Sequence, residues 1–176
     1  MPARSRRLTA ALGLAALTSV ALATAPASQA ADDTASVVRE LATATAATAK
    51  YASEALAIKD GYLRTDVCVA SPEGGMGYHY VNPKYIGSVD PRTPAAILYE
   101  DGKGGKRKLV AVEYVVPYTG QPAPKLFGRA FDGPDPIPEL GPAYDRHVWL
   151  FKKNPKGLFN RWNPKVTCPN GAATHP

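Results

Sequence analysis

The strongest structural signal in this chain is the segment Leu109–Pro117, Leu-Val-Ala-Val-Glu-Tyr-Val-Val-Pro. Its β-branched and aromatic residues favour an extended strand, and Pro117, which cannot donate a ladder hydrogen bond, ends it. Side chains alternate between the two faces of a strand, so Glu113 is expected on one face with Leu109, Ala111 and Val115. A carboxylate among apolar neighbours must be hydrogen-bonded, paired or protonated, which makes Glu113 the most informative residue of the strand.

Similar composition predicts further strands on both sides of this one. They are expected over residues 63–70, 77–82, 95–100 and 147–152, with a short edge strand at 166–168. The sequence Asp-Gly-Lys-Gly-Gly at 101–105 has the chemistry of a hairpin turn. Residues 118–144 contain six prolines and are predicted to form a packed loop, in which Leu126, Phe127 and Phe131 are buried.

The segment before these strands has a different pattern, which predicts one helix over about residues 33–60. It contains no proline, and Gly61 is expected to stop the helix. Alternating steps of three and four residues place one stripe on a single face: Val37, Leu41, Ala44, Thr48, Tyr51, Ala55, Ile58 and Tyr62. One helix followed by consecutive strands predicts an α+β fold, with the long N-terminal helix packed on a curved, mainly antiparallel sheet of about five strands.

The N-terminus has the three parts of an export signal, which predicts a secreted protein. An apolar stretch at 8–23 lies between a basic start (Arg4, Arg6 and Arg7) and Ser28-Gln29-Ala30, a small-x-small cleavage motif. We therefore assign residues 1–30 to a signal peptide cleaved near Ala30, and residues 31–176 to a single secreted domain without a stable membrane anchor. An uncleaved N-terminal anchor is the alternative, and both Sec and Tat export stay open.

Cysteine usage and charge limit the class of protein further. An oxidising compartment favours a disulfide between the two cysteines, Cys68 and Cys168. Without the three signal arginines, 18 basic residues face 15 acidic ones, a net charge of +3. This charge is too small to predict nucleic-acid binding. Composition does not predict an oligomeric state.

Three ionisable residues within predicted strands form the candidate site: His79, Glu113 and His147. Two imidazoles and a carboxylate suit a divalent metal, although no local motif such as His-Glu-x-x-His supports one. The first functional hypothesis is a non-catalytic module that binds a small ligand, with Tyr78, Tyr80, Trp149 and Trp162 as pocket aromatics. The alternative is a metal-dependent enzyme that uses the three residues, and the third is a structural or interaction protein in which they form a buried polar network.

Several blocks in a fixed order resemble an uncharacterised family of small secreted bacterial proteins. They are Gly75–Asn82 (GMGYHYVN), Leu98–Glu100, Val112–Pro117 (VEYVVP), and His147–Leu150 with Asn154-Pro155-x-Gly157-x-Phe159-x-x-Trp162-Asn163-Pro164 and Cys168. The resemblance covers about residues 61–168 and implies one shared domain. It implies no activity, so no catalytic residue is carried over from it.

Overall fold

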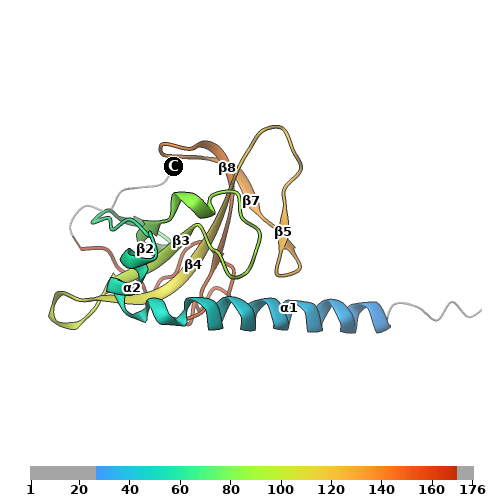
Figure 1. The fold of residues 1–176 in the computed structure, drawn as a ribbon, viewed down its shortest axis with the longest axis horizontal. Helices are drawn as coiled ribbons and strands as arrows, with labels where there is room; N and C mark the ends of the chain where they lie inside the picture. The colour runs from blue at the N-terminus through green and yellow to red at the C-terminus, as the bar shows by residue number, and fades with distance from the viewer. Residues whose placement is uncertain (1–26, 170–176) are drawn as a thin grey trace, which may run out of the picture.

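The computed structural model describes residues 27–169 as a long helix lying against a curled antiparallel sheet (Figure 1). Helix α1 (Ala27–Thr48) continues through the 3₁₀ turn η1 (Ala49–Ala52) into the short helix α2 (Glu54–Lys59). The N-terminal half of α1 extends past the sheet (Figure 1). The fold class expected from the sequence, α+β with one long N-terminal helix, is confirmed. Most of the proposed signal peptide lies outside the described residues.

Six strands form the main sheet, in the order β1-β2-β3-β4-β8-β7, and every neighbouring pair is antiparallel. The strands are β1 (Cys68–Ser71), β2 (Gly74–Val81), β3 (Ala96–Asp101), β4 (Arg107–Pro117), β7 (Asp132–Ile137) and β8 (Gly141–Val148). A separate hairpin consists of β5 (Lys125–Leu126) and β6 (Arg129–Ala130). Short 3₁₀ turns, η2 (Pro83–Tyr85) and η3 (Lys103–Gly105), follow β2 and β3. Among the described residues, no helix is long and apolar enough to cross a membrane.

The two faces of the sheet bury different side chains. The face toward the helix carries a tyrosine-rich core with Tyr80, Tyr99 and Tyr114. The opposite face carries a smaller apolar cluster that includes Leu98 and Trp149. This second face holds the candidate site, and the segment after β8 packs against it.

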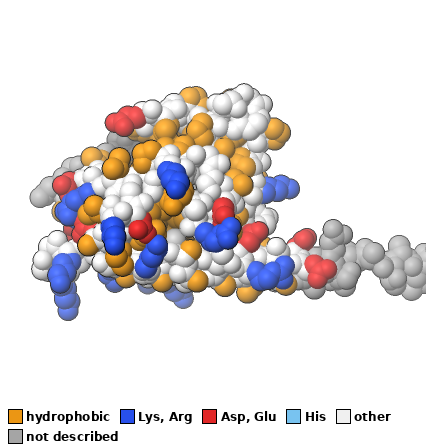
Figure 2. Space-filling view, in the orientation of Figure 1, with side chains coloured by type: hydrophobic (Ala, Val, Ile, Leu, Met, Phe, Trp, Pro, Cys, Tyr) orange, Lys and Arg blue, Asp and Glu red, His pale blue; other side chains and the backbone are white. Residues whose placement is uncertain are grey.

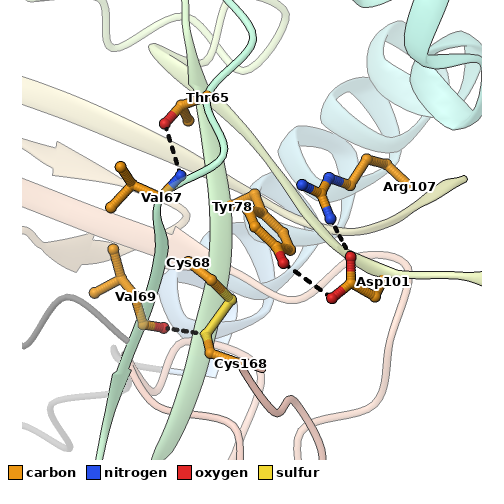
Figure 3. Close-up of a disulfide and its surroundings, with 8 residues drawn as sticks. All are labelled: Thr65, Val67, Cys68, Val69, Tyr78, Asp101, Arg107 and Cys168. Carbon is orange, nitrogen blue, oxygen red and sulfur yellow. Dashed lines mark hydrogen bonds and ion pairs between the residues drawn. A yellow bond between two sulfur atoms is a disulfide. The ribbon is translucent and has the colours of Figure 1, made fainter. Parts of the chain in front are cut away.

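The predicted disulfide is present and ties the edge of the sheet to the C-terminal segment (Figure 3). Cys68 lies at the start of β1, and Cys168 lies 100 residues later. Beside it, the Tyr78 hydroxyl donates to Asp101 at 2.9 Å, and Arg107 forms an ion pair with the same carboxylate (Figure 3). The bridge therefore encloses every strand of the sheet in one covalent loop.

The prediction of one regular helical stripe is wrong at Ala55 and Ile58, which are exposed, whereas Tyr51 and Tyr62 are buried as predicted. The 3₁₀ turn and the extended backbone of Ser53 change the phase of the helix. Ala57 is therefore the buried residue of α2, whereas Ile58 is 46% exposed. The predicted stop is confirmed, since α2 ends at Lys59 and Gly61 adopts a left-handed φ of +95°.

The strand predictions also need correction at the C-terminal side. The strand expected at 147–152 ends at Val148 and begins at Gly141, and residues 166–168 form no strand. Residues 118–144 are not only a loop, because they contain β5, β6 and β7. The predicted burial of Leu126, Phe127 and Phe131 is confirmed.

One register shift alters the faces within the central strands. Leu98 pairs with Ala111, but its neighbour Tyr99 pairs with Leu109, so the ladder skips Val110. Leu109 consequently packs in the core on the helix side, while Ala111 packs on the other side with Leu98. The expectation that Leu109 shares a face with Glu113 is therefore wrong.

Candidate metal centre

The structure brings the three predicted site residues together from three strands. His79 lies on β2, Glu113 on β4 and His147 on β8. Glu113 and His147 are direct partners across the β4–β8 ladder. Ala96 of β3 lies opposite Glu113, and its small side chain leaves room above β3 for His79 to approach from the next strand.

The ligand atoms of these three side chains face one another. Nε2 of His79 lies 3.4 Å from Oε2 of Glu113, and Nε2 of His147 lies 3.6 Å from Oε1 of the same carboxylate. One donor atom from each residue can be chosen so that all three lie within 4.8 Å of one another. The imidazole rings are nearly perpendicular, at 84°, with centroids 6.0 Å apart. The arrangement is a closed N,N,O triangle, which we call the His-Glu-His triad.

These distances fit a shared cation better than direct hydrogen bonds. An N–H···O hydrogen bond is about 2.7–3.2 Å long, shorter than either contact. Metal bonds of about 2.0–2.1 Å in a tetrahedral site place neighbouring ligand atoms about 3.3–3.4 Å apart. The same bonds in an octahedral site place them about 2.9 Å apart. The 3.4 Å contact to Oε2 therefore matches the edge of a tetrahedron around one ion, and the 3.6 Å contact, which ends on the other carboxylate oxygen, is slightly longer than that edge.

Asp145 orients His147 from behind. Its Oδ2 lies 3.0 Å from Nδ1 of His147, and this contact assigns the ring proton to Nδ1. The lone pair of Nε2 then faces Glu113, and this buried nitrogen has no hydrogen-bond partner among the described residues. A carboxylate that holds the far nitrogen of an imidazole is the arrangement that fixes metal-binding histidines and raises their basicity.

Arg161 in turn holds Asp145. One guanidinium nitrogen lies 2.6 Å from Asp145 Oδ1 and 2.6 Å from Asp135 Oδ2 on β7. The chain Asp135–Arg161–Asp145–His147 therefore links the sheet edge to the triad. Sequence analysis missed Asp145, Arg161 and Asp135. Asp145 carried a detectable signal, because it lies two residues before His147 and so faces the same side of the same strand.

Burial and charge shift the ionisation of these groups in a consistent way. Burial raises the pKa of Glu113 to about 7, an effect that the nearby His147 only partly offsets. Burial opposes the charged form of His147, but the carboxylates of Glu113 and Asp145 outweigh it and raise its pKa. Burial likewise disfavours ionised Asp145, but its hydrogen bond to His147 and the charge of Arg161 lower its pKa. The carboxylates of Glu113 and Asp145 thus favour a positive charge at the triad, which a proton on His147 or a bound cation can supply.

One side of the triad opens into a pocket, and the other side is closed. His79 and Glu113 line an apolar pocket of about 350 Å³. Its rim includes Leu63 and Val67, which are 61% and 55% exposed. His147 instead faces a cavity of about 20 Å³ shared with Asp145 and Arg161. An ion in the triad is therefore reached from the side of His79.

The structure places the four predicted pocket aromatics elsewhere. Tyr78 and Tyr80 belong to the core on the helix side, where Tyr80 donates to Glu54 at 2.6 Å. Alternation along β2 explains this, because both neighbours of His79 must point to the opposite face. Trp149 is buried in the second cluster, and Trp162 lines a different, polar pocket of about 590 Å³.

Elsewhere within residues 27–169, no other group of histidine, cysteine or acidic side chains converges in this way. On the face shown in Figure 2, acidic and basic side chains are interspersed with apolar ones. Four basic residues line the polar pocket, but three of them form ion pairs: Arg146 with Asp132, Lys156 with Glu73, and Arg161 with Asp135 and Asp145. The His-Glu-His triad remains the site with defined coordination geometry.

No family model, curated protein or solved structure matches this chain. The resemblance to a family of small secreted bacterial proteins therefore stays a prediction.

Proposed function

We propose that this chain is an exported zinc-binding protein in which His79, Glu113 and His147 hold the ion. The observation that carries the proposal is the convergence of one donor atom from each residue within 4.8 Å, with Nε2-to-carboxylate distances of 3.4 and 3.6 Å that are close to the ligand spacing of a tetrahedral site. Two imidazoles and one carboxylate form a known ligand set for zinc. Such a set leaves the fourth position for water or another ligand.

The charge of the site supports a divalent ion. Glu113 has a side chain that is only 9% exposed, and an isolated buried carboxylate is strongly disfavoured. A zinc ion bound to one carboxylate and two neutral imidazoles leaves a net charge of +1, which favours an anion or hydroxide at the fourth position. The negative charge of Asp145 and the positive charge of Arg161 largely cancel, so the pair orients His147 without neutralising the ion.

A different observation supports export. The Cys68–Cys168 disulfide is typical of a protein that folds in an oxidising compartment, and the first 30 residues have the pattern of a signal peptide. N-terminal sequencing of the protein from culture medium is expected to find a chain that begins near Ala31. A chain retained in the cytoplasm with its first residues intact would contradict export.

Metal content tests the zinc proposal directly. The purified, oxidised protein is stripped with a chelator and titrated with zinc by calorimetry, and bound metal is measured by mass spectrometry. Wild type is expected to bind one zinc per chain, and His79→Ala/His147→Ala and Glu113→Gln to lose it. Glu73→Gln is the matched control, because this carboxylate lies on the surface and pairs with Lys156.

A buried polar network is the competing function for the same residues. It predicts no stoichiometric zinc in wild type and no thermal shift on adding zinc. It also predicts that the three residues matter only for stability. Zinc binding that survives in Glu113→Gln would equally overturn the proposal, because the ion would then lie elsewhere.

A further inference from the structure

We infer that the pocket beside the triad binds a small apolar monocarboxylate, whose carboxylate occupies the fourth position on the zinc. This inference rests on the proposed zinc site and adds the class of ligand. The triad forms part of the pocket wall through His79 and Glu113, so a molecule in the pocket reaches the ion directly. The opposite side offers only about 20 Å³, which is too small for an organic ligand.

The walls of the pocket select an apolar body. Aliphatic side chains from five separate segments converge on it: Leu63, Val67, Val69, Val81, Ile86, Val115, Ile137 and Leu140. Leu63 and Val67, more than half exposed, lie beside these other apolar side chains, and a contiguous apolar patch of this kind marks a binding surface. A volume of about 350 Å³ lies at the small end of the range for ligand pockets. The occupant is therefore a small molecule.

The charge at the inner end of the pocket selects the head group. Zinc held by Glu113 and two neutral histidines carries a net positive charge, so an anionic oxygen donor is preferred over an amine or an alcohol. Arg64 also lines the pocket, but its guanidinium pairs with Glu54 at 2.6 Å and extends toward Asp66. The strongest attraction for a carboxylate is therefore the metal.

Chain length provides a quantitative test with straight-chain carboxylates from butyrate to octanoate. Each buried methylene contributes about 0.8 kcal/mol, so affinity is expected to rise about fourfold per carbon until the pocket is full. Acetate, octanol and octylamine serve as controls for the apolar body and for the head group. Binding is followed by calorimetry on the full-length mature protein, with and without one equivalent of zinc.

A pocket variant separates the two proposals. Val67→Asp introduces a negative charge at the exposed rim, where it is expected to weaken octanoate at least tenfold while leaving zinc and acetate affinity unchanged. Val38→Asp is the matched control, because Val38 is 60% exposed on α1 and does not line the pocket.

The results distinguish the zinc proposal from the ligand proposal. Absence of zinc binding overturns both proposals. Zinc binding without octanoate binding overturns only the ligand class, as does octanoate affinity that is equal with and without zinc. If octanoate binds no more tightly than acetate, or if Val67→Asp leaves its affinity unchanged, the apolar walls take no part in ligand binding.

Discussion

Replacing Glu113 with glutamine is expected to stabilise the metal-free protein and to abolish its stabilisation by zinc. Burial raises the pKa of Glu113 from 4.5 to about 7, so the folded state resists its ionisation. Well below pH 4.5 the carboxyl is neutral in both the folded and the unfolded state, so its burial does not lower the free energy of unfolding. As the pH rises from 4.5 to about 7, the unfolded chain releases this proton first, and the folded state is progressively destabilised. Glutamine has nearly the same shape and never ionises.

The size of the effect follows from the shift. One pKa unit corresponds to 1.36 kcal/mol, so the full penalty is about 3 kcal/mol above pH 7 and about 1 kcal/mol at pH 5. The charged and titratable groups that face Glu113 come from every neighbouring element: His79, His147, Asp145, Asp135 and Arg161. The pH-dependent part of the difference between variant and wild type, about 2 kcal/mol, combines the ionisation of Glu113 with its effect on His147, whose pKa this carboxylate raises.

Urea unfolding with a chelator, at pH 5 and pH 8, measures this difference. Zinc at 100 times its dissociation constant is then expected to stabilise wild type by about 2.7 kcal/mol and Glu113→Gln not at all. Glu73→Gln is expected to follow wild type under both conditions. A difference in stability between Glu113→Gln and wild type that is the same at pH 5 and pH 8 would refute the reasoning, because the carboxyl would then not be penalised by burial.

Three further outcomes are expected. Asp145→Asn removes the carboxylate that holds Nδ1 of His147, and it should weaken zinc affinity by about 10–100-fold in a chelator competition. Unchanged affinity would show that Asp145 does not influence zinc binding. Cys68→Ser/Cys168→Ser opens a loop of 100 residues and should lower the free energy of unfolding by about 4–5 kcal/mol in urea, whereas a loss below about 1 kcal/mol would contradict the entropic account. Gly77→Ala should lower the free energy of unfolding by well over about 2 kcal/mol, because φ is +97° and the new Cβ would lie 2.2 Å from the carbonyl oxygen of Tyr99 on β3. Gly104→Ala, where φ is +67° and no atom is near, should lower it by only about 1 kcal/mol. Equal losses in the two variants would show that the clash at Gly77 is relieved.

Sequence patterns predicted the helix-and-sheet layout because its strongest signals are local. The apolar run that became β4 and the proline-free segment that became α1 each have a clear period. The missed strand β7 contains Pro134 and Pro136, which argue against a strand by composition. Both are tolerated because β7 lies at the edge of the sheet and pairs only with β8.

The candidate site was predictable as residues but not as a network. His79, Glu113 and His147 were identified because ionisable side chains stood among apolar ones. Their convergence depends on strand order, because β8 pairs with β4 although β5, β6 and β7 lie between them in the sequence. Arg161 follows the sheet in a segment without strands, so no periodic pattern could link it to Asp145.

The two faces of the sheet separate the tyrosine-rich core from the proposed site. On the helix side, buried tyrosine hydroxyls donate to backbone carbonyls: Tyr62 to Pro94, Tyr99 to Tyr51 and Tyr114 to Pro91, at 2.7–2.9 Å. These bonds tie the sheet to the helix and to the loop before β3 without involving any atom of the triad. Substitutions in the triad therefore leave the larger core and its hydrogen bonds in place. A loss of zinc in those variants can accordingly be assigned to missing ligands, provided that the near-ultraviolet signal of the tyrosine-rich core is retained.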